Sequence, residues 1–337
     1  MSSTTTGHTA ASSEAASSTA TSGKVVTLAE LSAAETGAVV ARLPGAVVLA
    51  HGPDAAPFLH GQVANDVTGL PVGGVNQSLS LNHKGHAVAE GSVLRRAKDE
   101  VLLAIDDDGA AWVVESLKSH IIFDQVALEE QPDSAILTVQ GVKAAEVLPE
   151  APEPGAFKAV EVSGVPVVVL PRRRSAAGGF DLLVDAGSTQ AVMAALEAAG
   201  ALQVGAHVID ALRVRALVPT AGGEGGYGVL PQEAGLEGSL SYRKGCYLGQ
   251  EIMARIEARG NLRRSLVRLE LASQPGSVRQ ITREGRTVGV LGSSVLIESA
   301  DGAAPVVEAL AVLRNDLPDD AQLEVDGVAV CRLYNLP

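Results

Sequence analysis

A cysteine flanked by basic side chains is the part of this chain whose residue types could do chemistry. Arg243 and Lys244 stand just before Cys246. Between Arg243 and Arg268 the chain carries seven basic residues and two acidic ones, a local charge of +5, whereas the net charge of all 337 residues is −13. A cationic segment in an acidic chain indicates a site for a particular anion rather than a surface for polyanions.

The residues that follow Cys246 have the spacing of a helix that would fix its position. Their apolar stripe consists of Leu248, Ile252, Met253 and Ile256, and Gly260 is a typical helix end. Cys246 is therefore predicted at or near the helix N-terminus, where the peptide dipole and the basic neighbours favour the thiolate. A small residue that packs at a helix start explains the cysteine equally well, and the residues leave both interpretations open.

Side chains around this segment could bind an anionic or aromatic ligand. Arg263 and Arg264 have the fork geometry that grips a carboxylate or phosphate, although a solvated linker has the same composition. Glu251 and Arg255 stand four apart, in the orientation of a helix salt bridge. Two tyrosines are candidates for stacking on a flat heterocycle or for filling the core, namely Tyr227 and Tyr247.

Strands interleave with helices up to about residue 217. Strands are predicted at 46–50, 77–82, 87–94, 100–105, 135–139, 165–170 and 180–184, and helices at 54–63, 106–119, 189–199 and 207–217. Asp54 is expected to cap the first helix and the aspartates at 106–108 the second. The pair Lys84-Gly85 is read as a turn, and the arginines at 172–174 as a solvated turn. Hairpin-like spacings within this order indicate an α+β fold with antiparallel sheets.

The pattern of residue types changes after Arg264, and the rest of the chain has no helical pattern. Short β runs at 266–271, 287–290, 295–297, 309–313 and 328–333 are separated by Gly, Pro and Asp, which predicts an all-β barrel. The composition of residues 1–23 predicts a disordered tail. The chain length and the changes in residue pattern predict three domains, at 24–133, 134–262 and 263–337. The second of these domains carries the cysteine motif.

Composition excludes several classes of function. The acidic balance argues against nucleic-acid or anionic-membrane binding, and no apolar run reaches the roughly 18 residues that span a bilayer. Two cysteines, Cys246 and Cys331, exclude a disulfide framework and a cluster with four thiolates in one chain, and they indicate a cytoplasmic protein. Zinc-ligand spacing is absent, so no metal site is predicted. The N-terminal segment fits neither a secretion signal nor an arginine-rich transit peptide.

The cysteine motif resembles a known signature. Residues 244–251 read KGCYLGQE and are similar to the KGC[FY]xGQE signature of the YgfZ family. Members of this family bind tetrahydrofolate and are related to the aminomethyltransferase, or T protein, of the glycine cleavage system. Further segments resemble the family's other motifs: FLHGQVANDV at 58–67, LPQEAGL at 230–236 and GRTVG at 285–289. The similarity covers roughly residues 25 to 335.

The resemblance implies a three-domain cloverleaf around a central folate channel, with a C-terminal all-β barrel. It also implies a role in making or maintaining iron–sulfur enzymes, with client or assembly proteins as partners and Cys246 as the signature thiol. Lys244 is then expected to act beside Cys246, and arginines to meet the glutamate end of the folate. The residues expected to bind the folate are Arg255, Arg263, Arg264, Gln250, Glu251, Tyr247, Asn65 and Asp66.

Two departures from the aminomethyltransferases bear on mechanism. Those enzymes carry an acidic pair after a strand turn, whereas this chain has Ala89-Glu90. They also carry a glutamate that contacts the pterin, and Arg215 stands at that place here. Without these carboxylates the groups expected to assist transfer at nitrogen are missing, which argues against glycine-cleavage activity. The leading prediction is a folate-binding accessory protein, with two alternatives: a folate-dependent aminomethyltransferase, and a thiol-based interaction module without folate.

Overall fold

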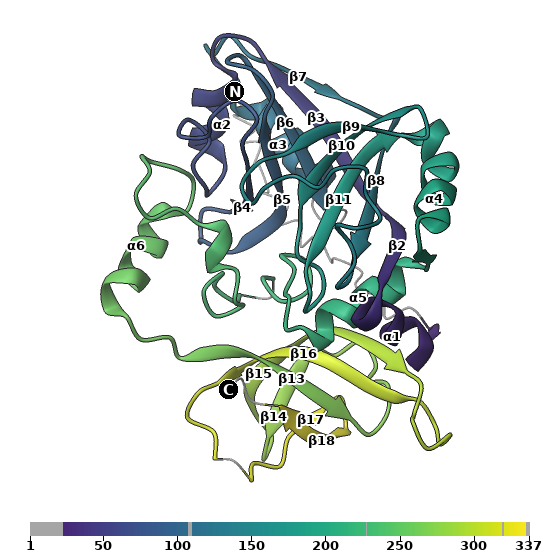
Figure 1. Cartoon of the computed structure of the whole chain (residues 1–337). Coiled ribbons are helices and arrows are strands. Elements are labelled where there is room, and N and C mark those ends of the chain that lie inside the picture. Colours follow the sequence, from purple (N-terminus) through teal and green to yellow (C-terminus); the bar gives the residue numbers. More distant parts are fainter. Residues whose placement is uncertain (1–22, 107–109, 227, 319, 335–337) are drawn as a thin grey trace, which may run out of the picture.

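Three mainly antiparallel sheets and the helices between them make up the molecule (Figure 1). The structure is a computed structural model that describes residues 23–106, 110–226, 228–318 and 320–334. Apart from Gly23, the predicted tail lies outside these ranges, as do Asp107, Asp108 and Tyr227. No helix in these ranges is long and apolar enough to cross a membrane.

The first sheet has five strands in the order β4-β5-β6-β3-β7. Its strands are β3 (Gly45–His51), β4 (Val75–Leu81), β5 (Ala87–Arg95), β6 (Glu100–Asp106) and β7 (Ala127–Glu130). Two helices, α2 (Ala55–Gln62) and α3 (Ala110–His120), cover one face through Leu59 and Leu117. Asp54 stands at the predicted N-cap, but its carboxylate accepts a hydrogen bond from the Gln125 backbone at 2.7 Å instead of capping α2.

The second sheet has six strands in the order β12-β2-β8-β11-β10-β9. Its strands are β2 (Ala38–Leu43), β8 (Ser134–Gln140), β9 (Lys158–Val162), β10 (Val165–Pro171), β11 (Gly179–Asp185) and β12 (Ala201–Gln203). Helix α4 (Thr189–Ala198) packs on it through Val192 and Leu196. The opposite face meets the first sheet, where Leu94 and Leu102 pack against Leu170 and Leu183.

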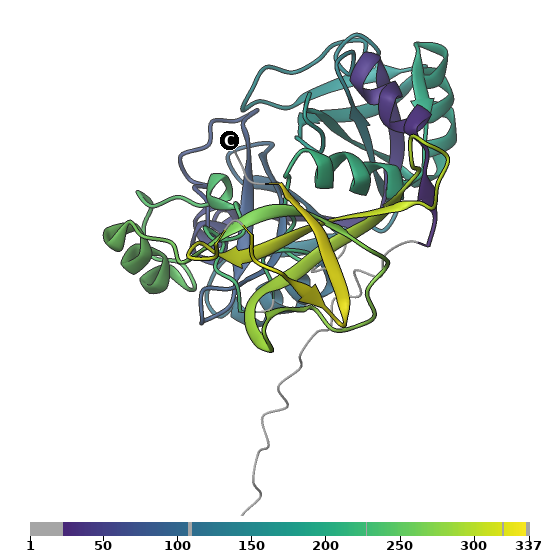
Figure 2. The same ribbon diagram turned by 90° about the horizontal axis from the view of Figure 1, so that it is seen from below.

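The C-terminal strands close into a barrel (Figures 1 and 2). Six strands pair around it in the order β15-β14-β17-β18-β13-β16, and β16 pairs back with β15. Their bounds are β13 (Arg264–Leu271), β14 (Gln280–Arg283), β15 (Arg286–Ile297), β16 (Val306–Arg314), β17 (Glu324–Val325) and β18 (Val328–Tyr334). The two β runs predicted at 287–290 and 295–297 are one strand, because a register shift between Leu291 and Ser294 lets β15 bend without ending.

A central core joins the barrel to the rest of the chain. Helices α1 (Leu28–Thr36) and α5 (Ala206–Arg215) contribute Leu31 and Val208, and the barrel contributes Leu266 and Val312. The N-terminal strand β1 (Val25–Val26) runs parallel to β15, while β2 belongs to the second sheet. The α+β class, the antiparallel sheets and the C-terminal barrel are thus confirmed. The limits of the three domains remain a proposal, since the N-terminal strands reach into the barrel and the second sheet.

The prediction of a solvated turn at residues 172–174 is wrong for two of the three arginines. Arg172 and Arg174 are buried between the two sheets, and only Arg173 is exposed. Arg174 donates to Asp106 and Asp181 at 2.8 and 2.7 Å. The predicted helix cap is wrong for Asp106 as well, because this residue ends β6 and its carboxylate faces both arginines. Burial of these guanidinium groups is tolerated because each of them has carboxylate partners.

Candidate functional site

The helix predicted after Cys246 is present as α6 (Gln250–Arg259). Gly249 stands at its N-cap with φ 83°, and an added Cβ there would meet the Asn82 carbonyl oxygen at 2.9 Å. Gly260 ends the helix with φ 62°, as predicted. Met253, a residue of the predicted apolar stripe, is fully buried and lies against the turn that contains Gly85. Cys246 therefore lies just before the helix rather than inside it, with an exposed side chain.

Lys244 holds together two segments that are far apart in sequence. Its buried ammonium group donates to the backbone carbonyl oxygens of His60, Val63 and Asn65, the last at 3.1 Å. Burial lowers the pKa of Lys244 to about 8, against the opposing effect of Asp66. Three carbonyl acceptors match the three N–H bonds of an ammonium group, so this clamp favours the charged form. It joins the FLHGQVANDV and KGCYLGQE motifs.

Removing the clamp is expected to destabilise the protein. Lys244→Met leaves three carbonyl oxygens without their donor, and we expect the free energy of unfolding to fall by about 3 kcal/mol. Chemical denaturation at neutral pH measures this, with Lys84→Met as the control because Lys84 is an exposed lysine on the nearby turn. Equal stability of the two variants would show that the clamp contributes nothing to folding.

His60 is the residue of this site that the sequence reasoning missed. Its Nδ1 lies 3.1 Å from Asp66 Oδ1 and 3.1 Å from the Thr68 hydroxyl. Burial and the Lys244 charge lower the pKa of His60, so the ring is neutral at pH 7. Burial alone would raise the pKa of Asp66, but the Gly69 N–H bond and the neighbouring His60 hold it below its usual range. The one feature of the sequence that could have indicated His60 was its place within the FLHGQVANDV motif.

The other candidates from the octapeptide and its partner motif lie in the core, in the loop after α2 or at the start of α6. Tyr247 belongs to the central core, and its ring lies under the Lys244 ammonium with 4.7 Å between Nζ and the ring centroid. Burial raises the pKa of Tyr247 to about 12. Asn65 bonds the Gln77 carbonyl at 2.7 Å, which shapes the loop after α2. Gln250 is half-buried at the first position of α6.

The arginines expected to bind an anion differ in their partners and in their exposure. Arg264 donates to Glu233 at 2.6 Å and to the Gly228 carbonyl at 3.0 Å. Arg263 and Arg255 are exposed. Within the part of the chain that the structure describes, Glu251 and Arg255 do not form the expected ion pair, and both side chains face solvent.

The two positions that depart from the aminomethyltransferases are engaged in ion pairs. Glu90 is buried and accepts a hydrogen bond from Arg172 at 2.9 Å. Arg215 donates to Glu308 of the barrel at 2.8 Å. Burial raises the pKa of Glu90 to about 8, against the opposing effect of Arg172 and with a further rise from Asp106. Both positions are thus committed to contacts within the protein.

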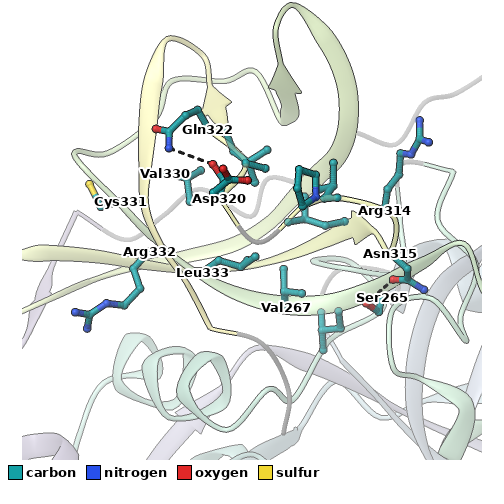
Figure 3. Close-up of a pocket in the computed structure, with 16 residues that line it drawn as sticks. Ser265, Val267, Arg314, Asn315, Asp320, Gln322, Val330, Cys331, Arg332 and Leu333 are labelled. Atoms are coloured by element: carbon teal, nitrogen blue, oxygen red, sulfur yellow. Dashed lines mark hydrogen bonds between the residues drawn. The ribbon is translucent and has the colours of Figure 1, made fainter.

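The second thiol lies in another part of the molecule. Cys331 is on β18 and lines a cavity of about 460 Å³ in the barrel, together with Val267, Asn315, Asp320 and Leu333 (Figure 3). Both cysteines are free. No residue of the KGCYLGQE motif lines this cavity. Among the residues that the structure describes, no three His, Cys, Asp or Glu side chains converge as metal ligands.

Two sheets with their helices, a closed barrel and a lysine that joins two distant sequence motifs are the features to compare with known proteins. A model of the GCVT N-terminal domain matches residues 45–244, and the chain belongs to this family. The predicted relationship to YgfZ proteins and aminomethyltransferases is thereby confirmed.

Similar proteins carry both of these names. The tRNA-modifying protein YgfZ of Cronobacter sakazakii is 28% identical over 288 residues, which are 79% of this chain and 81% of that protein. The aminomethyltransferase of Exiguobacterium sibiricum is 28% identical over 256 residues, 73% of this chain and 70% of that protein. A crystal structure of the glycine cleavage system aminomethyltransferase T from Bartonella henselae superimposes with a TM-score of 0.71 at 18% identity, covering 91% of this chain and 87% of the other. At that identity the likeness shows a shared fold.

Proposed function

We propose that the protein is a cytoplasmic folate-binding accessory protein for iron–sulfur enzymes, and that Cys246 is its functional thiol. One observation carries the proposal: the exposed Cys246 lies beside the clamp that joins two motifs in a chain of this family. An exposed cysteine among basic residues is suited to chemistry or docking, because the thiolate is the reactive form and positive charge favours it. Tetrahydrofolate or a derivative is the proposed ligand.

The proposed ligand contacts follow from charge. Arg255 and Arg263 have exposed guanidinium groups that are free to meet the carboxylates of a folate glutamate tail. Arg264 contributes less directly, because Glu233 already neutralises part of its charge. Asn65, Asp66, Tyr247, Gln250 and Glu251 are proposed to shape the surrounding pocket.

Aminomethyl transfer is the second candidate, and the named relatives favour it. The ion pairs of Glu90 and Arg215 argue against this candidate. Each side chain is bound to a charged partner within the protein, and so neither is free to hold a pterin or to move a proton at nitrogen. An assay with an aminomethylated lipoyl carrier and tetrahydrofolate separates the two candidates. Turnover by the purified protein would make it an enzyme of one-carbon transfer.

Calorimetric titration with tetrahydrofolate tests the ligand. We expect binding to the wild type and about tenfold weaker binding after Arg255→Gln or Arg263→Gln, since each loses a charged contact worth roughly 1.4 kcal/mol. Arg96→Gln is the matched control, because Arg96 is an exposed arginine outside the cationic segment. Absence of heat at high micromolar ligand would remove folate from the proposal.

Complementation tests the thiol. In a strain deficient in iron–sulfur enzyme maintenance, we expect the wild type to restore activity of the client enzymes and Cys246→Ser to fail. Cys331→Ser is the control, because it removes the other free thiol. Full rescue by Cys246→Ser would reduce Cys246 to a packing role and would leave the folate result untouched.

A further inference from the structure

The cavity in the barrel lies where the two strands beside β13 extend to different lengths along it. Strand β13 pairs with β16 as far as Arg264 and Arg314, whereas its described pairing with β18 reaches only Arg268 and Tyr334. The first residues of β13 therefore lack a β18 partner within the described part of the chain. The cavity of about 460 Å³ lies at this point, between these strands and the residues at 317–318 and 320–323 (Figure 3).

Hydrogen bonds hold the walls of this cavity in place. The side chain of Asn315 donates to the Leu262 carbonyl at 2.9 Å and accepts from the Ser265 hydroxyl at 2.8 Å. At another wall, the Val330 N–H donates to the Leu323 carbonyl at 2.9 Å. A cavity whose walls are fixed in this way needs little reordering when a ligand enters, so less of the binding free energy is lost.

Apolar side chains form the floor of the cavity. Val267, Leu313 and Leu323 are buried members of the barrel core, and Leu333 packs against them. The volume of the cavity is within the range of small-molecule sites, and the mouth of a β-barrel is a common place for such a site. Contact with these side chains favours a ligand that has an apolar body, because apolar surface is removed from water on binding.

The charged side chains that line the cavity decide the charge of the ligand. Figure 3 shows the side chains of Arg314 and Arg332 pointing away from each other, with Asp320 between them. Each arginine already has a carboxylate nearby: Arg314 binds Asp316 at 2.9 Å, and Arg332 stands opposite Glu270, whose charge opposes its own. Among the residues that the structure describes, no hydrogen bond or ion pair engages the Asp320 carboxylate. The uncompensated charge of the cavity is therefore negative, which favours a cation.

We propose that the cavity in the barrel binds a small organic cation, an amine with an apolar body, and that Asp320 is its counter-charge. The ammonium group donates to the Asp320 carboxylate, and the apolar body contacts Val267, Leu323 and Leu333 on the floor. No residue of the KGCYLGQE motif lines the cavity, so this inference goes beyond the proposed folate function and does not depend on it.

Three matched probes test the charge of the ligand. Phenethylamine carries the cation, 2-phenylethanol replaces it with a neutral group, and hydrocinnamate replaces it with a carboxylate. An NMR titration of the full chain, labelled at the methyl groups of leucine and valine, follows the signals of Val267 and Leu333. We expect the amine to bind about fivefold more tightly than the alcohol, because an exposed ion pair makes a modest contribution to affinity. The carboxylate should bind more weakly than the alcohol, since Asp320 repels it.

Variants of the carboxylate and of the cavity wall separate the two parts of the site. Asp320→Asn should bind the amine and the alcohol within about twofold of each other. Glu324→Gln is the control, because Glu324 is an exposed carboxylate close in sequence that does not line the cavity. Val330→Phe fills part of the cavity and should weaken all three probes about tenfold, and Ala321→Phe replaces it as the test if that variant fails to fold.

Each outcome of these titrations bears on the proposal. Hydrocinnamate binding as tightly as phenethylamine, or a preference for the amine that survives Asp320→Asn, would overturn the cationic ligand. Unchanged signals of Val267 and Leu333 at about 10 mM amine would overturn the site itself. Tetrahydrofolate is titrated into the same samples, and displacement of the amine by it would make the cavity a part of the folate site. Failure of tetrahydrofolate to bind would overturn the proposed function alone.

Discussion

Arg174→Met is expected to lower the free energy of unfolding by about 3–5 kcal/mol, because it leaves buried carboxylates without their partner. Arg174 binds Asp181 through two nitrogens, with distances of 3.1 and 2.7 Å, and reaches Asp106 at 2.8 Å. Methionine replaces the aliphatic stem of arginine without its charge, so the loss of the ionic partner dominates over the smaller loss of packed volume. Urea denaturation at neutral pH measures the effect.

The neighbouring arginine supplies the control for this experiment. Arg173 belongs to the same run of three, yet it is exposed and donates only to the Ser175 and Ala216 carbonyls, both at 3.3 Å. Arg173→Met should change stability by less than about 0.5 kcal/mol. Equal losses in Arg173→Met and Arg174→Met would contradict a buried ion network. Adding Asp181→Leu to Arg174→Met should recover part of the stability, because it removes one of the unpaired charges.

The run of arginines also shows why sequence reasoning failed at this place. The alternation of β10 continues past its end, so the first and third arginines point between the sheets and the middle one points outward. The partners of Arg172 stand 82 and 66 positions earlier in the chain, at Glu90 and Asp106. A run of one charge has no local feature that reveals such distant acceptors, whereas solvation is its usual state.

Local patterns predicted the elements whose causes are local. The apolar stripe and Gly260 predicted α6, and the β runs after Arg264 predicted the barrel. Helix α1 was missed although Thr27 and Glu30 form a capping box, which is a signal readable from the sequence. The bend in β15 was read as a gap between strands, because a bulge interrupts the residue alternation without ending the pairing.

The candidate site was also predictable only in part from the sequence. The KGCYLGQE motif directed attention to Lys244 and Cys246, and the resemblance directed it to Asn65 and Asp66. The contact between the two motifs was not predictable, since Lys244 binds backbone carbonyls, which any sequence provides. His60 became a candidate only through its contacts with Asp66 and Thr68.

Glu90→Gln is expected to remove a strong pH dependence of stability. Glu90 and Asp106 share the two arginines unequally: Asp106 forms ion pairs with both Arg172 and Arg174, whereas Glu90 forms an ion pair with Arg172 and is affected by Arg174 more weakly. This asymmetry keeps the pKa of Asp106 below its usual range, although burial alone would raise it. Burial of Glu90, opposed by Arg172 and more weakly by Arg174 and reinforced by Asp106, raises its pKa from 4.5 to about 8. The proton of the pair therefore resides on Glu90 at neutral pH.

The sign of the pH effect follows from linkage. Between pH 4.5 and about 8 the folded protein keeps the Glu90 proton and the unfolded chain has lost it, so stability falls as pH rises through this window. The contribution is fully present below the unfolded pKa and is lost once pH passes the folded pKa. Each pH unit in the window costs about 1.4 kcal/mol at most, and we expect a total near 3 kcal/mol because neighbouring charges relax.

Glutamine imitates the protonated carboxyl group and has no proton to lose. Glu90→Gln and the wild type should have similar unfolding free energies near pH 5, and the variant should be more stable by about 3 kcal/mol near pH 8.5. Glu100→Gln is the control, since Glu100 is a half-buried glutamate on β6 of the same sheet. Urea denaturation of the three proteins at both pH values provides the measurement. Parallel pH curves for Glu90→Gln and the wild type would show that Glu90 is already ionised in the folded protein, and the buried cluster would then carry one uncompensated negative charge.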